Sequence, residues 1–464
     1  LERGCTDDLI LLRKSPEVPS LDEVLGNEVS TPLASILDHF SEGATFGTVS
    51  GRRQSFLLSQ RPDLIPLAVR GHVETRISRL IEGRVDAIVL AEVGLARLNG
   101  TGALDGMKEG LSAFRIAKED WPTAPGQGAI AVHCLTDRFE QMSELRSVLN
   151  HPATEADVLG ERRLLKEAGG GCLYPAGIGV EGGRVHVQIS PENWREIFCQ
   201  GSAFSMFSYS GNLHELDLKL PTQSLKTVQL RTGQPRYIST LNSDRISLVL
   251  SSHGIDMENV PVVDLSPKFD QWPQDFLRDY NRKRDWPYLV LTSPFVAKCA
   301  VQAAASNPDI GRIPWVAIGE GTARACFRLG VTVAVCAKAR NAHQLATYIT
   351  ENFPRSTTFF LPRSSLASPA FEESLQAAGF SVKAWIGYEN APKELAPVEV
   401  SGEDVLVLSS ASSAISWAKN GLKVPRDILC MGDNARTTIQ SLDHFDGCQV
   451  SVLKGPTSDA LVEW

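Results

Sequence analysis

The chain has 464 residues, of which 43% are hydrophobic and 22% charged, and its formal net charge is −8 at pH 7. This length predicts two to four domains, each with its own core. The negative charge argues against nucleic-acid binding as the main role, and no apolar run approaches the ~20 residues that span a bilayer. We therefore expect no nucleic acid and no membrane among its partners.

The nine cysteines are widely separated and form no CxxC pair. This distribution is typical of a reducing compartment, so we expect a cytoplasmic protein. The spacing is unlike that of zinc ligands, and we expect no metal site. The chain begins at Leu1 rather than Met, and we expect both of its ends to be truncated.

Residues 1–45 are mixed and polar, with a helix expected around Ser30–Phe40. A short β-rich run then ends in small residues at Ser50, and a helix is expected to begin at Arg52. The first main-chain N–H groups of such a helix point at whatever lies in front of it, which favours an anion.

From residue 51 to residue 100 the only basic residues besides histidine are eight arginines: Arg52, Arg53, Arg61, Arg70, Arg76, Arg79, Arg84 and Arg97. The planar guanidinium group grips a carboxylate with two hydrogen bonds. In a chain of negative net charge, this run indicates a small ligand rich in carboxylates. We favour ligand binding for Arg52, Arg53, Arg70 and Arg76, and ordinary surface positions for Arg61, Arg79 and Arg84.

A single cysteine, Cys172, lies in the glycine-rich stretch Gly169–Pro175, directly after a helix expected over Asp157–Ala168. Glycines often end helices and leave room around a neighbouring side chain. Two interpretations are open, an approachable nucleophilic thiol and a buried structural cysteine, and these residues alone favour the second.

Apolar periodicity predicts a buried strand at Asp86–Ala91, a loop running into a strand over Thr123–Val132, and a strand at Arg184–Ile189. Residues 190–222 look irregular, with a linker at Leu220–Thr222. Beyond it, short apolar strands alternate with helical patterns, which is typical of parallel α/β sheets. The strands are expected at 288–292, 315–319, 331–336, 358–362, 382–388, 405–409, 427–431 and 449–453.

Two parts of this second half are similar to one another. Leu289–Ser293 resembles Leu406–Ser410, and similar elements follow each of these segments. Two such subdomains facing one another would place strand-end loops around a cleft. Hydroxyl groups and glycines at these loops suit anion binding, although helix capping explains any single one equally well. The candidates for substrate binding are Thr292, Ser293, Gly319, Ser409 and Ser410.

Up to about residue 215 the chain resembles porphobilinogen deaminase, also called hydroxymethylbilane synthase. The resemblance rests on six ordered motifs: Gly47–Gln54, Arg61–Leu64, Arg70–Arg76, Asp86–Ala91, Ala124–Ala129 and Gly170–Pro175. It implies that Cys172 carries a dipyrromethane cofactor through a thioether and that Ser50, Arg52, Arg53, Arg70 and Arg76 bind the carboxylates of this cofactor. It also implies porphobilinogen as the substrate, hydroxymethylbilane as the product and Arg97 as a substrate-binding residue.

The chain departs from the deaminase pattern at its start. Leu1 aligns just beyond the Lys-Asp segment of the family, and the aspartate of that segment is the carboxylate expected to handle protons. No other carboxylate of this sequence can be assigned that role. Deaminase activity is therefore expected only if the absent segment is supplied by a longer protein or by another chain.

From about Thr222 onward the chain resembles uroporphyrinogen-III synthase, which closes hydroxymethylbilane into a ring. The resemblance rests on the two-subdomain pattern, on Leu361–Arg363 and on Gly387–Tyr388. Tyr388 is the candidate catalytic acid, with a packed aromatic residue at the hinge as the equal alternative. Where the family often has Gly-Pro-Thr-Thr this chain has Gly432–Ala435, and Asn434 is the candidate donor to substrate there.

Together these patterns predict a multidomain α/β protein. A deaminase-like domain is expected over 1–150, a smaller domain with Cys172 over 151–221, and a synthase-like part over 222–464. The latter divides into 222–263 with 388–464, and 264–387. The expected function is a bifunctional enzyme of tetrapyrrole and heme biosynthesis, both a transferase and a lyase. The alternatives are that only the synthase half is active, or that the chain is a non-catalytic binder of anionic tetrapyrroles.

Overall fold

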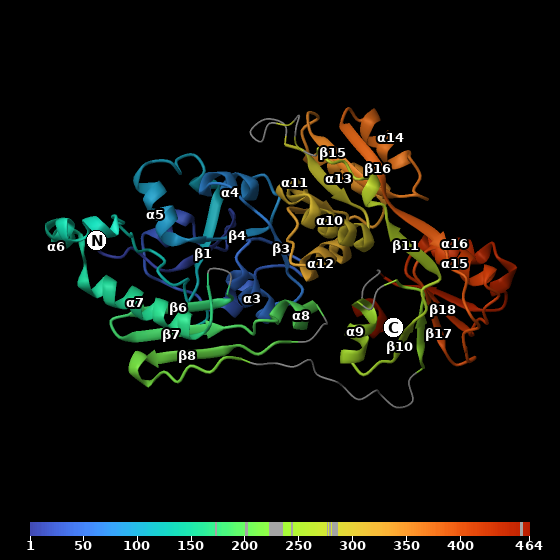
Figure 1. Cartoon of the computed structure of the whole chain (residues 1–464), viewed down its shortest axis with the longest axis horizontal. Coiled ribbons are helices and arrows are strands. Elements are labelled where there is room, and N and C mark those ends of the chain that lie inside the picture. The colour runs from blue at the N-terminus through green and yellow to red at the C-terminus, as the bar shows by residue number, and fades with distance from the viewer. Residues whose placement is uncertain are drawn as a thin grey trace. The chain divides into compact units, whose positions relative to one another are not determined.

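A computed structural model describes residues 1–171, 174–199, 203–221, 235–242, 245–275, 277, 280, 286–454 and 458–464. The chain divides into two compact units, which are described separately (Figure 1). Unit 1 contains Leu1–Phe198 and Ala203–Ser224, and unit 2 contains Cys199–Ser202 and Leu225–Trp464. No described helix is both long and apolar enough to cross a bilayer.

The larger sheet of unit 1 has the strand order β3-β2-β4-β1-β5. Strand β2 runs parallel to β3 and β4, whereas β1 is antiparallel to β4 and β5. The strands are β1 (Asp8–Arg13), β2 (Thr45–Gly47), β3 (Ile65–Leu67), β4 (Ala87–Ala91) and β5 (Leu111–Arg115). Its helices are α1 (Leu21–Leu25), α2 (Leu33–Leu37), α3 (Gly51–Gln60), α4 (Val73–Ile81) and α5 (Glu92–Gly100).

Strand β1 corrects the sequence prediction, which placed no strand in residues 1–45. Leu9, Ile10 and Leu11 are completely buried between β4 and β5. The apolar run is short, and charged residues lie on both sides of it. The mean hydropathy of any longer stretch of sequence around it is therefore low. The helix expected around Ser30–Phe40 is shorter, because α2 covers only Leu33–Leu37.

The second sheet of unit 1 is a three-stranded antiparallel meander, β6-β7-β8, covered by α7 (Figure 1). Leu164 of α7 packs with Ile178 and Val187 in its core. Gly182 and Gly183 both have positive φ, 57° and 81°, which the two-residue turn between β6 and β7 requires. The elements are α7 (Pro152–Glu167), β6 (Ala176–Glu181), β7 (Arg184–Ile189), α8 (Trp194–Cys199) and β8 (Phe207–Asn212).

Helix α7 ends as the glycine stretch predicts. The N–H of Gly170 donates to the carbonyl of Leu165 at 3.0 Å, and Gly169 has φ 74°. This is the left-handed helix end that glycine favours. Residues 190–222 are more regular than expected, since α8 and β8 lie within them.

The strand expected at the end of Thr123–Val132 is not formed. This segment contains a turn at residues 125–128 and otherwise has no regular structure, and it is followed by two 3-10 helices (Thr136–Arg138 and Glu140–Met142) and by the short helix α6 (Ser143–Leu149). Ile130 and Val132 have the alternation of a strand, yet both are exposed. A strand needs a neighbour for its main-chain groups, and the described residues of unit 1 supply none to this segment.

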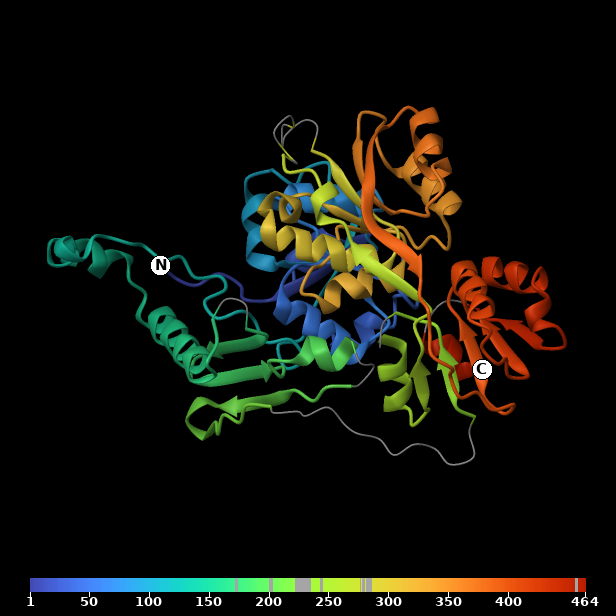
Figure 2. The same ribbon diagram turned by 45° about the vertical axis from the view of Figure 1, so that its right-hand side comes forward.

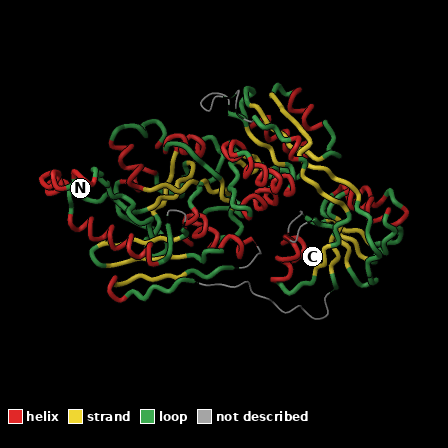
Figure 3. Tube along the Cα trace, in the orientation of Figure 1, coloured by secondary structure: helices red, strands yellow, loops and turns green. Residues whose placement is uncertain are grey.

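Unit 2 contains two α/β sheets, seen as two groups of strands in Figure 3. The first is fully parallel, in the order β10-β9-β17-β18-β19. Its strands are β9 (Tyr237–Ser239), β10 (Met257–Asn259), β17 (Val405–Leu408), β18 (Asp427–Cys430) and β19 (Gln449–Val452). Its helices are α9 (Arg245–Ser252), α15 (Ala411–Lys419), α16 (Asp433–Gln440) and α17 (Ser458–Glu463).

The other sheet has the order β11-β16-β15-β12-β13-β14, in which only β11 is antiparallel to its neighbour. Its strands are β11 (Val263–Pro267), β12 (Tyr288–Leu291), β13 (Trp315–Ala317), β14 (Val335–Cys336), β15 (Thr358–Ser364) and β16 (Ser381–Pro392). Its helices are α10 (Pro294–Ser306), α11 (Pro308–Arg312), α12 (Glu320–Arg328), α13 (Ala342–Asn352) and α14 (Ala370–Ala377).

The predicted α/β class is confirmed, and each of the eight strands expected after residue 285 is present as β12 to β19. The parallel sheet is built from two chain segments, one before β11 and one after β16. The two segments meet where β9 pairs with β17. Its core lies on both faces and includes the completely buried Ile238, Leu406 and Val407.

Candidate functional site

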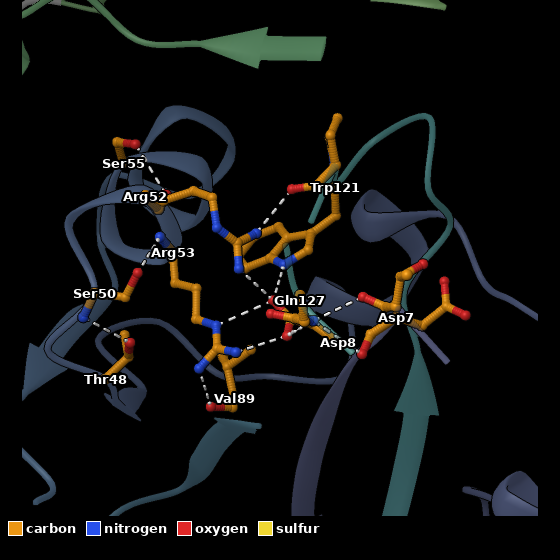
Figure 4. Close-up of polar contacts among 12 residues, drawn as sticks. Asp7, Asp8, Thr48, Ser50, Arg52, Arg53, Ser55, Val89, Trp121 and Gln127 are labelled. Carbon is orange, nitrogen blue, oxygen red and sulfur yellow. Dashed lines mark hydrogen bonds and ion pairs between the residues drawn. The ribbon is translucent and has the colours of Figure 1, made fainter. Parts of the chain in front are cut away.

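The centre of unit 1 is a buried carboxylate held by two arginines (Figure 4). Asp8 begins β1, and its side chain is completely buried. Its Oδ2 accepts from Arg52 Nη2 at 2.7 Å and from Arg53 Nε at 3.0 Å, and its Oδ1 accepts from Arg53 Nη2 at 2.6 Å. Trp121 Nε1 and Gln127 Nε2 donate at 2.8 Å and 3.0 Å.

This arrangement fixes the protonation state of Asp8. Burial by itself raises the pKa of the carboxyl, but the charges of Arg53 and Arg52, with their hydrogen bonds and that of Trp121, outweigh burial and hold the pKa well below its usual range. Asp8 is therefore an ionised acceptor that orders both arginines. With five donors on one carboxylate, it is not poised to exchange a proton with a ligand.

Arg52 and Arg53, which the sequence predicts as ligand-binding residues, both have internal partners in the structure. Arg52 also donates to the carbonyl of Pro122 at 2.8 Å and is only 5% exposed. The remaining guanidinium nitrogen of Arg53, Nη1, donates to the carbonyl of Val89 at 2.9 Å. The reason is the buried Asp8, which needs two cations and which the sequence pattern did not reveal.

Other predicted residues gather at the carboxyl ends of the parallel strands β2 and β3. Ser50 caps α3 and accepts from the N–H of Arg53 at 3.4 Å. Arg76 donates from Nε to the carbonyl of Gly71 at 2.9 Å, and burial together with the charge of Arg53 lowers its pKa. Arg70 is exposed, and no described residue pairs with its guanidinium group.

The other predicted residues of this half lie apart from that group or outside the described residues. Arg97 is exposed, and its Nη2 donates to the carbonyl of Gly128 at 3.3 Å. Cys172, the predicted cofactor anchor, lies outside the described residues.

A cavity of about 680 Å³ in unit 1 is lined by Cys5, Asp7 and Glu92 among other residues. Ligand atoms of these three lie within 4.8 Å of one another. Glu92 is already held by Arg115 at 2.7 Å. Desolvation and the neighbouring carboxylates raise the pKa of Cys5 to about 12, so its thiol is protonated at neutral pH. We assign no metal to this cluster.

In unit 2, Tyr388 and Ser293 are brought together from distant parts of the sequence. Tyr388 lies near the end of β16, is 8% exposed, and packs against Phe295 with ring centroids 5.1 Å apart. Ser293 caps α10 by accepting from the N–H of Val296 at 3.2 Å. The phenolic oxygen of Tyr388 and Oγ of Ser293 are 3.5 Å apart.

A second group of hydroxyls surrounds the start of α15. Ser409 contacts Thr240 Oγ1 at 3.2 Å and Ser413 Oγ at 2.9 Å. Ser410 caps the helix and contacts Ser412 Oγ at 2.9 Å. Sequence reasoning missed Thr240 and Ser413, although the run Ser409–Ser413 contains four serines and was the available signal.

The remaining predicted residues of unit 2 lie at strand ends. Thr292 follows β12 and is half-buried, and Gly319 precedes α12. Asn434 is exposed in the first turn of α16. The structure thus places Thr292, Ser293, Gly319 and Tyr388 on one sheet, and Ser409, Ser410 and Asn434 on the other.

Two family models match separate parts of the chain. Residues 11–143 match the family model for the dipyrromethane cofactor binding domain of porphobilinogen deaminase. Residues 244–463 match that for uroporphyrinogen-III synthase HemD. The predicted fusion of the two families is confirmed.

Individual relatives match parts of the chain. A porphobilinogen deaminase of Desulforudis audaxviator is 42% identical over 141 residues, which are 30% of this chain and 43% of that protein. One of Brevibacillus brevis is 36% identical over 171 residues, 37% of this chain and 51% of that protein. The chain spans about half the length of the curated relatives it matches. A uroporphyrinogen-III synthetase structure from Helicobacter pylori covers 50% of this chain and 97% of its own, with 14% identity and a TM-score of 0.35.

Proposed function

We propose that this chain, which joins a porphobilinogen deaminase domain to a uroporphyrinogen-III synthase domain, serves two consecutive steps of tetrapyrrole biosynthesis in the cytoplasm. Porphobilinogen and hydroxymethylbilane are the proposed substrates, and uroporphyrinogen III is the proposed product. The proposal for the synthase step rests on a match over residues 244–463, and that for the deaminase step on a shorter match over residues 11–143.

The observation that supports the deaminase half is the group of cations at the ends of β2 and β3. Arg53 lies in the first turn of α3, Arg76 in the first turns of α4 and Arg70 in the loop before α4, and the charge of Arg53 contributes to the lowered pKa of Arg76. Neighbouring positive charges repel one another unless an anion lies between them. A dipyrromethane carries several carboxylates, so the exposed Arg70 and half-buried Arg76 fit this group. When bound, it supplies the anchor on which the product chain grows.

In this assignment the residues of unit 1 bind the carboxylates of the cofactor and hold one another in position. Asp8 holds Arg52 and Arg53 rigid, and Arg53 in turn keeps a fixed positive charge beside Arg76. Arg70 and Arg76 bind carboxylates, Ser50 orders the start of α3, and Cys172 is the proposed attachment point.

For the synthase half, Tyr388 is the proposed acid. Ring closure needs the leaving hydroxyl of the substrate to be protonated and the flexible chain to be held folded. The phenolic hydroxyl of Tyr388, which lies within β16, is a proton donor set against Ser293 at the start of α10. Ser409, Ser410 and Asn434 then contribute polar contacts to carboxylates from the other sheet.

One experiment tests each half. Intact-protein mass of the chain, produced with porphobilinogen available and with the Lys-Asp segment of the family supplied, should show a covalent adduct that is lost in Cys172→Ser. Synthetic hydroxymethylbilane should be converted mainly to the III isomer, whereas isomer I alone arises without the enzyme. Isomer I alone would rule out the synthase assignment.

A second candidate, a chain with only synthase activity, is favoured by one observation. Asp8, the buried carboxylate nearest the arginines, accepts from four side chains. It is therefore not available for proton transfer. Unmodified Cys172 together with formation of isomer III would select this candidate.

A further inference from the structure

Strand β16 changes partners along its length. Its first part, Ser381–Tyr388, pairs with β15, and its last part, Tyr388–Pro392, pairs with β11. Figures 1 and 2 show β16 as one long strand that runs on beside β11. Tyr388 lies where the two pairings meet, so the direction of its side chain depends on how the strand is built at that point.

The register of β16 against β15 shifts by one residue just before Tyr388. Arg363 pairs with Ile386, whereas the next residue of β15, Ser364, pairs with Tyr388. Gly387 is therefore the extra residue of a β-bulge. Arg363 and Ser364 are neighbours in a strand and point to opposite faces of the sheet. Their partners Ile386 and Tyr388 then also lie on opposite faces, although in a regular strand they would share one.

The bulge turns Tyr388 away from the face that α13 and α14 cover. Val382 and Ala384 of β16 pack in a core with Leu345 of α13 and Leu375 of α14. Unbroken alternation along β16 would place Tyr388 on this same face. Tyr388 instead contacts two residues at the start of α10. Bulges re-aim side chains in this way beside active sites.

The bulge needs a glycine because its main chain approaches β15 closely. A Cβ atom on residue 387 would lie 2.7 Å from Cβ of Pro362. Carbon atoms of different residues pack at about 3.5–4.0 Å, and the proline ring is rigid and cannot turn aside. Any side chain at Gly387 would therefore push β16 away from β15 directly before Tyr388.

Two donors from the chain segment of β11 hold the carbonyl of Gly387. Nε1 of Trp272 and the main-chain N–H of Lys268 both donate to it at 3.1 Å. This carbonyl shares one rigid peptide plane with the nitrogen of Tyr388, so the two bonds fix the direction in which Tyr388 leaves the bulge. Trp272 is itself fixed, since it is 4% exposed and its ring centroid lies 5.4 Å from that of Trp385.

We propose that Trp272 and Gly387 are positioning residues for Tyr388. The indole N–H of Trp272 stabilises the bulge at Gly387, and the bulge presents the phenolic hydroxyl of Tyr388 to Ser293. This inference rests on the proposed role of Tyr388 as the acid of ring closure. It assigns Trp272 and Gly387 no contact with the substrate.

Trp272→Phe tests the proposal, because it keeps an aromatic ring and removes the donor. The kcat for formation of isomer III from hydroxymethylbilane should fall about tenfold with KM unchanged, since a displaced acid slows the chemical step. Trp315→Phe is the matched control. Trp315 is 3% exposed, lies in the same sheet and donates to the carbonyl of Ile310 at 3.0 Å. This control should lose a similar amount of stability and keep its kcat.

A second pair of variants tests the bulge itself. Gly387→Ala should lower kcat at least about tenfold, because the added methyl group displaces the bulge. Gly311→Ala is the control, since no atom lies within 4 Å of a Cβ built at Gly311, and it should keep full activity. Full activity of Gly387→Ala, or equal losses of kcat in Trp272→Phe and Trp315→Phe, would overturn the proposal.

A double variant shows whether Trp272 acts through Tyr388. Trp272→Phe combined with Tyr388→Phe should be no slower than Tyr388→Phe alone, because no acid is left to be positioned. If the two losses multiply instead, Trp272 acts independently of Tyr388 and the proposal fails.

The position of Tyr388 is also measured without activity. With fluorotyrosine at the seven tyrosines, the fluorine NMR signal that is missing from Tyr388→Phe belongs to Tyr388. It should be single and sharp in the parent chain and in Trp315→Phe, and broadened or split in Trp272→Phe, where the bulge relaxes. A single sharp signal in Trp272→Phe would overturn the proposal. Full kcat in Tyr388→Phe would instead reject Tyr388 as the acid, and the fluorine signal would still decide whether Trp272 positions it.

Discussion

The phenolic oxygen of Tyr388 lies 3.5 Å from Oγ of Ser293, across 95 positions of sequence. The two meet because β12 and β16 flank β15 in one sheet. Ser293 sits at the start of α10, where main-chain N–H groups favour a negative charge. A carboxylate held there would lie beside the hydroxyl of Tyr388.

Tyr388→Phe removes that hydroxyl and keeps the ring that packs on Phe295. If Tyr388 supplies the proton, kcat for formation of isomer III should fall about 100-fold with the melting temperature unchanged. Tyr237→Phe, in the buried strand β9, is the matched control and should keep full activity. Equal rates for both variants would assign Tyr388 to packing.

Arg70→Ala should weaken binding of anionic pyrroles without affecting stability, since its guanidinium group is exposed. Loss of one charged hydrogen bond of about 2 kcal/mol lowers affinity about 30-fold. Titration calorimetry with porphobilinogen measures the change. Arg84→Ala is the control, because Arg84 pairs with Glu82 at 2.7 Å, and a similar loss there would contradict the assignment.

Asp8→Asn should strongly destabilise unit 1. The change leaves two arginines near one another without their counter-charge, and breaking a buried pair in this way costs about 3–5 kcal/mol. Urea denaturation followed by tryptophan fluorescence would report it. Asp63→Asn removes a pair with Arg61 that is about one quarter exposed, and should cost at most about 1 kcal/mol.

Asp8 also predicts a loss of stability in acid. Its folded-state pKa is depressed, so its contribution is fully present above the unfolded value of about 3.9 and is lost as the pH falls towards the folded value. The melting temperature of unit 1 should therefore fall steeply below about pH 4. In Asp8→Asn the slope should be shallower, and an unchanged slope would show that other carboxylates dominate.

Cys5 should resist alkylation although it is an exposed residue. Its pKa is raised to about 12 by desolvation and by the nearby carboxylates of Asp7 and Glu92. At pH 8 its thiolate fraction is then about 2,000-fold below that of an ordinary thiol with a pKa of about 8.5. Peptide mapping after iodoacetamide treatment should show modified Cys134, also exposed, and intact Cys5. Comparable rates at pH 8 would contradict this prediction.

Local patterns predicted the strands β12 to β19 because each contains a short apolar run, as in Leu289–Leu291 and Leu406–Leu408, but they did not predict β9, β10 and β11. They failed for β1, whose burial depends on β4 and β5 far along the chain. For the same reason the arginines were predicted as ligand-binding residues while Asp8 was missed. Asp8 lies 44 positions before Arg52, so no local pattern links the two residues. Eight arginines between residues 51 and 100 do form a local pattern.

The strand that begins with Asp8 is synthesised before the two strands that flank it, β4 and β5, and before the donors that hold Asp8. Gln127, one of its hydrogen-bond donors, lies 119 positions later. At 5–20 residues per second, this delay at the ribosome is roughly 6–24 s. Throughout that time Leu9, Ile10 and Leu11 have no finished sheet to enter. Nascent chains arrested before and after Gln127 should therefore differ sharply in protease resistance, because β1 stays exposed until its partners have been made.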